Sequence, residues 1–280
     1  MKKLIPMAIC YDFDGTVSPG NMQEYGLMKA LKQESASAFW KESNDLAYAN
    51  EADEIAAYMH LILAKLKEKK IRPTRAAFQK FGSDIKLYAG VAGWFKRINA
   101  YALSKGVLLK HYIISSGLKE MVEGMPIAKE FEAIFASTYM YNLKGEAFWP
   151  AMVLNYTSKT QFIFRINKGC EDLRDNKTIN RYISRNERPM PFENMIYIGD
   201  GETDIPCMKM VKMEGGHSIA VYDARKEKPS KIDRLVADNR VNAVKAADYR
   251  AGRPLEKYIH SVIDKVVADD TLKAQGVNEK

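Results

Sequence analysis

Two aspartates separated by one residue lie near the amino terminus, in the run Tyr11-Asp12-Phe13-Asp14-Gly15-Thr16. The apolar stretch before them, 4–10, predicts a short buried strand. Residues i and i+2 of an extended chain point to the same side, so the carboxylates of Asp12 and Asp14 can face one cleft. Two acids at one place repel each other unless a cation or a proton offsets their charge. The pattern therefore predicts a cation site and makes an enzyme the first hypothesis.

Polar residues also follow two later apolar segments that predict strands. His111–Ile114 is followed by Ser115-Ser116-Gly117, and Met195–Ile198 is followed by Gly199-Asp200-Gly201-Glu202-Thr203-Asp204. In open parallel sheets, ligands bind beyond the carboxyl ends of the strands. One cleft could therefore collect Asp12, Asp14, Ser115 and Asp200.

The elements that must position these residues alternate between strands and helices. This alternation predicts an α/β fold with a Rossmann-like parallel sheet flanked by helices. After Tyr88-Ala89-Gly90 we expect a helix at 91–105, then the strand before Ser115, and then a hairpin or short extended segments within 131–164. A helix capped by Asp175 or Asn176 follows, then the strand before Asp200, strands at 218–222 and near 244–248, and a helix around 255–267.

The segment from Asn21 to about Gly82 differs because it predicts helices throughout, with no strong strand. Its clearest helix spans 51–70, with Asn50 as the expected N-cap, and another helix is expected from Thr74. Glycine and proline bracket this block on both sides. We therefore expect an all-helical domain inserted into the α/β core.

Composition excludes several classes of function. The net charge of +8 would suit a polyanion, but the basic residues are interleaved with acids, as in 65–70, and no aromatic and basic platform accompanies them. No apolar run approaches the roughly 20 residues of a transmembrane helix. We expect neither a nucleic-acid nor a membrane partner, and we interpret 1–10 as the first core strand of a cytoplasmic protein. The cysteines Cys10, Cys170 and Cys207 and the four histidines lack the spacing of metal ligands or of a disulfide framework. The sequence also contains neither of the glycine-rich motifs that bind dinucleotides or nucleoside triphosphates.

Four ordered pieces resemble the haloacid dehalogenase-like hydrolases: the Asp12–Thr16 motif, the strand ending in Ser115, a lysine on a following helix, and the Gly199–Asp204 motif. The chain looks most similar to the phosphoserine-phosphatase-like branch, in which a helical cap follows the first motif. This resemblance implies a catalytic core formed by 1–19 and 87–280, and a cap formed by 20–86.

The resemblance also implies a chemistry, namely Mg²⁺-dependent hydrolysis of a small phosphorylated metabolite. Asp12 would be the nucleophile that forms an aspartyl-phosphate, and Asp14 would exchange protons with the leaving group and with water. Asp12, the backbone carbonyl of Asp14, and Asp200 would bind Mg²⁺, with Asp204 as a nearby ligand or orienting group. A phosphotransferase or mutase, and a non-catalytic phosphate-binding module, remain alternatives.

Phosphate oxygens need donors and a cation. Ser115, with the backbone N–H groups of Ser116 and Gly117 at an expected helix N-terminus, supplies donors. Lys159, Lys168 and Lys177 all lie in the window expected for the family lysine. We prefer Lys177, because it opens a helix shortly before the third strand, and place Lys159 second.

The substrate stays open. In phosphoserine-specific relatives, an acid about nine residues beyond the nucleophile grips the substrate amino group. Here that position is Asn21, and the nearest acid is Glu24. Asn21, Gln23, Glu24 and Trp40 are candidate substrate contacts, although packing of the helical segment explains them equally well. The sequence does not indicate an oligomeric state.

Overall fold

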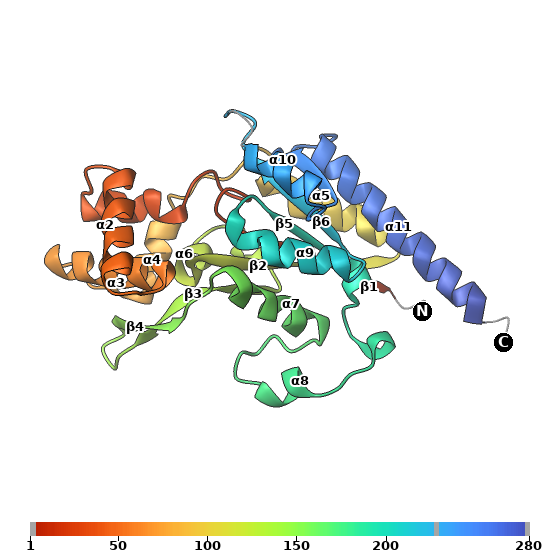
Figure 1. Ribbon diagram of the computed structural model, residues 1–280, viewed down its shortest axis with the longest axis horizontal. Coiled ribbons are helices and arrows are strands. Elements are labelled where there is room, and N and C mark those ends of the chain that lie inside the picture. Colours follow the sequence, from red (N-terminus) through yellow and green to blue (C-terminus); the bar gives the residue numbers. More distant parts are fainter. Residues whose placement is uncertain (1–3, 227–229, 278–280) are drawn as a thin grey trace.

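The computed structural model describes residues 4–226 and 230–277. Within these ranges, seven strands form one sheet in the order β4-β3-β2-β1-β5-β6-β7 (Figure 1). All neighbouring strands are parallel except β3 and β4, which form the predicted hairpin. The α/β fold with a mostly parallel sheet is thus confirmed. The strands are β1 Ile5–Tyr11, β2 Val107–Leu118, β3 Ala133–Tyr141, β4 Ala147–Met152, β5 Met195–Gly199, β6 His217–Tyr222 and β7 Ala243–Ala246.

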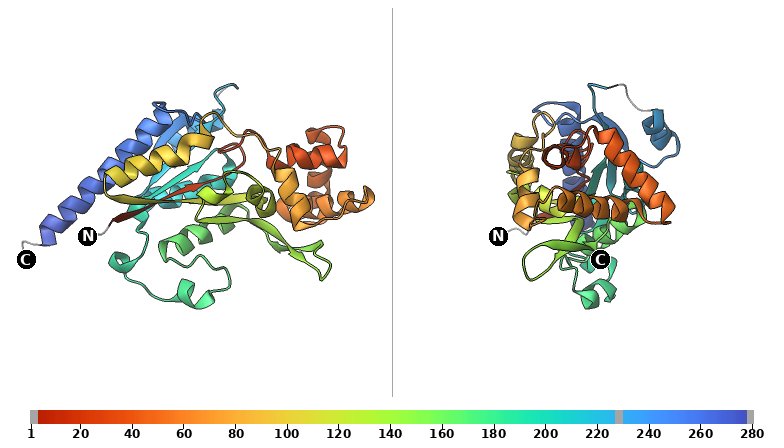
Figure 2. Two further views of the ribbon diagram at one scale, coloured as in Figure 1. Left: turned by 180° about the vertical axis from the view of Figure 1, so that it is seen from behind. Right: turned by 90° about the vertical axis from the view of Figure 1, so that its left-hand side faces the viewer.

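Helices cover both faces of the sheet. Side chains alternate along β1, so that Met7, Ile9 and Tyr11 pack into one core and Ala8 and Cys10 into the other. Helices α5 (Val91–Ser104) and α11 (Pro254–Val277) contribute to the first core. Helices α7 (Thr160–Asn167), α9 (Ile205–Met213) and α10 (Ser230–Ala237) contribute to the second. Figures 1 and 2 show these two layers from opposite sides. Burial on both faces explains why the strands read as continuous apolar runs.

The order in which strands are added to the sheet reverses at its centre, although the strands there are parallel. From β1 the chain proceeds through β2 and β3 on one side, whereas β5, β6 and β7 extend the sheet on the other. Strands β1 and β5 are direct neighbours, and the backbone N–H of Asp12 donates to the carbonyl of Ile198 over 2.9 Å. Such a switch point leaves a crevice outside the carboxyl ends of the strands, and it is the usual place for a ligand.

Four helices separate β1 from α5: α1 (Gly26–Leu31), α2 (Ala36–Ala49), α3 (Glu54–Glu68) and α4 (Arg75–Gly82). We call residues 20–86 the helical insertion. It lies beyond the carboxyl ends of the central strands, on the left of Figure 1.

The start of α3 corrects one expectation from the sequence. Asp53, and not Asn50, is its N-cap, since the Asp53 carboxylate accepts from the N–H groups of Ile55 and Ala56. Asn50 instead ends α2. Glu51 has a φ of 49°, and this left-handed residue breaks the helix that the charge pattern suggested. The expected start of α4 after Thr74 is confirmed, because Thr74 caps it.

Close backbone contacts join the helical insertion to the core at α6 (Lys119–Glu123). A Cβ on Gly82 would lie 1.9 Å from the carbonyl oxygen of Met121, and one on Gly124 would lie 2.0 Å from that of Gln79. Glycine at both positions lets α4 approach α6 and the turn that follows it.

Two further helical features bear on the sequence expectations. Helix α8 (Asn176–Asn180) is capped by Asp175, as predicted. In the residues that the structure describes, no helix is both long and apolar enough to cross a bilayer.

Candidate active site

Asp12 and Asp14 lie where β1 ends, as the motif predicts. The Asp12 side chain is 8% exposed. The Asp14 carboxylate accepts the backbone N–H of Met22 over 2.8 Å, which ties it to the first residues of the helical insertion. Gly15 follows with a φ of 72°, a left-handed conformation that glycine adopts at no steric cost.

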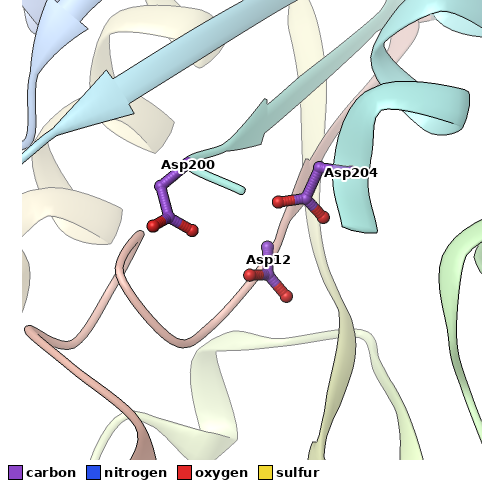
Figure 3. Close-up of side chains that lie close together, drawn as sticks. All are labelled: Asp12, Asp200 and Asp204. Atoms are coloured by element: carbon purple, nitrogen blue, oxygen red, sulfur yellow. The ribbon is translucent and has the colours of Figure 1, made fainter. Parts of the chain in front are cut away.

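Asp200 follows β5 and approaches the Gly15 turn. A Cβ on Gly15 would lie 2.1 Å from a carboxylate oxygen of Asp200, so the absence of a side chain makes this approach possible. Carboxylate oxygens of Asp12, Asp200 and Asp204 lie within 4.8 Å of one another (Figure 3). This hard, anionic oxygen set fits a divalent cation such as Mg²⁺. The fold thus brings together three of the predicted ligands.

Lys159 lies at the centre of the acidic cluster. Its side chain is fully buried, and its Nζ lies 3.0 Å from Oδ1 of Asp12 and 2.8 Å from Oδ1 of Asp204. It also donates to the Thr203 hydroxyl over 3.3 Å. A short 3-10 helix, Tyr156–Lys159, leads from the β3–β4 hairpin into α7 and places the lysine here.

The preference for Lys177 is therefore corrected in favour of Lys159. Lys177 is exposed on α8, in a segment that loops away from the sheet in Figure 1. Lys168 is also occupied elsewhere, since its Nζ donates to the carbonyls of Ile179 and Arg181. A signal for Lys159 was present in the sequence: Asn155 and Ser158, residue types that favour helix starts, stand just before this lysine, and the Ser158 hydroxyl accepts the backbone N–H of Asn155 over 2.7 Å.

Asp204 is completely buried, and both of its carboxylate oxygens have partners. Oδ1 accepts from Lys159 and from the Tyr197 hydroxyl, the latter over 2.8 Å, and Oδ2 accepts from the N–H of Gly201. Gly199 permits this packing, because a Cβ there would lie 2.5 Å from Oδ2 of Asp204. Asp204 thus holds Lys159 and the Gly199–Asp204 turn in place.

The environment shifts the pKa values of these groups. Burial raises the pKa of Asp12 to about 7, with a further contribution from Asp204, and Lys159 opposes the rise. Burial and then the charge of Asp12 raise the pKa of Asp14 well above its ordinary value. Burial lowers the pKa of Lys159, but Asp12 and Asp204 more than offset this, and the net shift is upward. Lys159 is therefore charged, and Asp14 is the acid suited to carry a proton.

Ser115, Ser116 and Gly117 lie at the end of β2, where its register with β3 shifts. Their expected position at a helix N-terminus is corrected, because α6 begins only at Lys119. The Ser115 hydroxyl accepts the N–H of Gly117 over 3.0 Å. The Ser116 hydroxyl is buried and has no hydrogen-bond partner among the described residues.

A cavity of about 320 Å³ joins these groups. The ends of β1, β2 and β5 and the Lys159 turn line one side, and the helical insertion lines the other. The insertion contributes Asn21, Gln23, Trp40, Ile55 and Tyr58. Six of the predicted site residues from the core thus share one cavity with Lys159: Asp12, Asp14, Ser115, Ser116, Gly117 and Asp200.

Glu24, another candidate substrate contact, does not line this cavity. One oxygen of its carboxylate accepts from the Asn21 amide over 2.8 Å and from the Trp40 indole N–H over 2.9 Å. Glu24 therefore holds Asn21 and Trp40 by hydrogen bonds without lining the cavity itself.

Comparison with protein families agrees with this geometry. A model of the haloacid dehalogenase-like hydrolases matches residues 9–209. The chain belongs to this family. An uncharacterized protein from Borreliella burgdorferi strain B31 is 28% identical to it over 281 residues, covering 90% of this chain and 95% of that protein.

Solved structures share the fold at low sequence identity. A HAD family hydrolase from Salmonella enterica serovar Typhi superposes with a TM-score of 0.54 at 18% identity, covering 86% of this chain and 67% of the other. A probable phosphoserine phosphatase from Vibrio cholerae gives 0.54 at 13% identity, covering 96% and 67%. A substrate-bound phosphoserine phosphatase gives 0.53 at 14% identity, covering 87% and 93%. These similarities concern the fold.

Proposed function

We propose that the protein is a Mg²⁺-dependent phosphatase that hydrolyses a small phosphate monoester through an aspartyl-phosphate on Asp12. The observation that carries this proposal is the buried contact of Lys159 with Asp12 and Asp204, in a cavity that also contains Asp14 and Asp200. Membership of a hydrolase family supports it.

The two aspartates after β1 have different roles in this proposal. A carboxylate oxygen of Asp12 attacks phosphorus, and the bond from phosphorus to the ester oxygen breaks. Asp14 gives its proton to the departing oxygen, in keeping with its raised pKa. Asp14 then takes a proton from water as that water attacks the aspartyl-phosphate, which returns Asp12 and releases phosphate.

The remaining residues position the phosphoryl group and balance its charge. Lys159 contacts Asp12 and neutralises charge where the phosphate would lie. The Ser115 and Ser116 hydroxyls would donate to phosphate oxygens, and the Gly117 N–H, which donates to the Ser115 hydroxyl, would orient it. Asp12, the carbonyl of Asp14 and Asp200 would hold Mg²⁺, which, when bound, offsets the negative charge shared by the carboxylates and the phosphate. Asp204 acts as a positioning residue through Lys159.

The helical insertion, residues 20–86, would serve as a cap over a catalytic core formed by 1–19 and 87–280. It supplies one wall of the cavity and, through Met22, a hydrogen bond to Asp14. A cavity of about 320 Å³ is at the small end of ligand sites, which supports a small metabolite as substrate.

Phosphate release from p-nitrophenyl phosphate tests the proposal. We expect turnover that requires Mg²⁺ and is lost in Asp12→Asn, which keeps the shape of the side chain but removes the nucleophile. An inactive wild-type protein, or an Asp12→Asn variant as active as wild type, would show that the proposal is wrong.

A further inference from the structure

Among the residues that the structure describes, the helical insertion places no charged side chain in the lining of the cavity. The five residues that the helical insertion places there are two amides, two aromatic rings and one aliphatic chain: Asn21, Gln23, Trp40, Tyr58 and Ile55. The acids and the lysine of the cavity all come from the core side: Asp12, Asp14, Asp200, Glu202 and Lys159. If the phosphoryl group sits on the core side, the rest of the substrate meets an uncharged wall.

Gln23 has an unused acceptor in this wall. The residue is 2% exposed, and its Oε1 has no hydrogen-bond partner among the described residues. The Gln23 side chain lies close enough to Tyr58 to act on it: burial raises the pKa of that phenol, and Gln23 opposes the rise. The Tyr58 hydroxyl in turn donates to the carbonyl of Ser116 over 2.7 Å. A buried acceptor without a donor costs free energy, so the site is set to receive a donor from a ligand.

The nearest acid of the insertion does not supply a countercharge. Glu24 lies outside the cavity lining and accepts from Asn21 and Trp40, both of which line the cavity. These contacts hold the Asn21 amide and the Trp40 indole ring in place, and the Glu24 carboxylate stays outside the cavity lining. An ammonium group on the substrate would therefore meet neutral dipoles on this wall and make no direct ion pair with it, which leaves part of its desolvation cost uncompensated.

We propose that the leaving group of the substrate is an uncharged alcohol that carries a further hydroxyl, as in the phosphate ester of a polyol or sugar. The hydroxyl donates to Oε1 of Gln23, and the carbon skeleton lies against the Trp40 and Ile55 side chains. Gln23 is then a specificity-determining residue. This inference rests on the proposed phosphatase function.

Two matched pairs of esters test the charge preference. The first pair is 2-hydroxyethyl phosphate and phosphoethanolamine, and the second is glycerol 3-phosphate and serinol phosphate, so that an ammonium group replaces one hydroxyl in each pair. We expect kcat/KM for the uncharged member to exceed that for the ammonium member by at least about tenfold in each pair, since an unpaired buried charge costs more than an exchanged hydrogen bond. An ammonium member hydrolysed as fast or faster would overturn the inference.

Hydrolysis of p-nitrophenyl phosphate under the same conditions separates the two possible failures. If the aryl ester is hydrolysed but the uncharged esters are not favoured, only the inference about the leaving group is wrong. If no ester, including the aryl ester, is hydrolysed in the presence of Mg²⁺, the proposed phosphatase function fails and the inference falls with it.

A variant tests the role assigned to Gln23. Gln23→Met keeps the length of the side chain and removes the acceptor, and Gln33→Met makes the same change in the insertion outside the cavity lining. We expect the ratio of kcat/KM for glycerol 3-phosphate to that for p-nitrophenyl phosphate to fall about tenfold in Gln23→Met. The ratio should not change in Gln33→Met. An unchanged ratio in Gln23→Met would show that Gln23 does not read the leaving group.

Discussion

Lys159 is the residue on which the site depends most. Its ammonium group has no exposed surface, yet it contacts two carboxylates at 3.0 and 2.8 Å. Without Lys159, the buried carboxylates of Asp12 and Asp204 would repel each other. The proposed nucleophile, Asp12, would also lose its neighbouring positive charge. Its contacts with Asp204 and Thr203 hold the ammonium group in one position.

Lys159→Met should lower kcat/KM for a phosphate ester by at least about a hundredfold, because a fixed charge at the reacting group is removed. Lys177→Met is the matched control, and we expect wild-type activity from it, since Lys177 is exposed on α8. Steady-state kinetics with p-nitrophenyl phosphate would measure both. Equal losses in the two variants, or a loss only in Lys177→Met, would refute the assignment.

Gly15→Ala tests the close approach of Asp200 to the β1 turn. Its Cβ would lie 2.1 Å from the Asp200 carboxylate, whereas a Cβ on Gly145, which has a nearly equal φ of 71°, would have nothing within 4 Å. Both substitutions should cost about 1–2 kcal/mol of unfolding free energy through the left-handed backbone. Only Gly15→Ala should also abolish activity, because Asp200 must move.

Denaturant unfolding and turnover, measured side by side, would check this comparison. Activity retained in Gly15→Ala at the level of Gly145→Ala would mean that the position of Asp200 does not matter.

Some residues of the site could be predicted from the sequence, and others could not. Asp12, Asp14 and Asp200 follow apolar strands directly, so local pattern and sheet topology are enough to bring them together. The position of Lys159 is set by the path of the β3–β4 hairpin and by the 3-10 turn that follows it, and strand spacing carries no information about that path. The unpartnered Oε1 of Gln23 depends on tertiary packing and could not be predicted.

At the scale of the elements, a buried hydrogen-bonded chain links β1, β2 and α5. The Trp94 indole donates to the Tyr11 hydroxyl over 2.8 Å, and this hydroxyl lies 3.0 Å from Nδ1 of His111. Nε2 of His111 lies 2.8 Å from Oδ1 of Asn99. A neutral imidazole that accepts at Nδ1 and donates at Nε2 satisfies every partner. Burial lowers the pKa of His111 to about 3.

This histidine should make stability depend on pH. Because its folded pKa lies below the unfolded value of about 6.5, the neutral ring stabilises the fold fully above pH 6.5 and progressively less as the pH falls toward 3. In that window His111 adds up to about 1.4 kcal/mol per pH unit to the slope of the unfolding free energy. His111→Asn should remove this contribution.

Urea unfolding between pH 7 and pH 4 would measure the slope. His60→Asn, a change at an exposed position of α3, serves as the control and should leave the slope of wild type. A slope that His111→Asn does not reduce would contradict the prediction.

The elements themselves were largely predictable, because strands buried on both faces are apolar throughout and helices α2, α3, α4 and α8 begin at a polar N-cap side chain. The error at α3 has a local cause. Acids at 51–54 are equally compatible with a helix start at Asn50 or at Asp53, and the left-handed Glu51 decides between them. The position of Ser115–Gly117 before α6 was also missed, since a β-bulge extends the strand past the serines.

At the scale of the whole molecule, the cavity exists only because two parts of the chain meet. Tyr58 of α3 donates to the carbonyl of Ser116, and Asp53 accepts from the Asn155 amide over 3.0 Å, close to the Lys159 turn. The helical pattern of 21–82 and the glycine and proline residues on both sides of it predicted an insertion next to a parallel sheet. Motif order agreed with this. These patterns did not predict which face of the insertion meets the core, since that depends on contacts between distant residues.

Metal binding should stabilise the folded molecule as a whole. Mg²⁺ at about a hundredfold above its Kd should raise Tm by about 5 °C, because a ligand of the folded state adds to the unfolding free energy. Asp200→Asn should lose most of this rise. Thermal unfolding in MgCl₂ and in NaCl of equal ionic strength would separate binding from screening, and equal Tm values in the two salts would contradict a Mg²⁺ site.

The most direct test of the central claim is to locate the covalent intermediate. Wild-type protein mixed with Mg²⁺ and p-nitrophenyl phosphate would be quenched with acid during turnover, digested and examined by mass spectrometry. We predict a phosphoryl group on the peptide that contains Asp12, and none on that peptide in Asp12→Asn. Phosphate release with the phosphoryl group on another residue, or with no phosphorylated peptide under conditions that preserve acyl phosphates, would contradict the assignment of Asp12 as nucleophile.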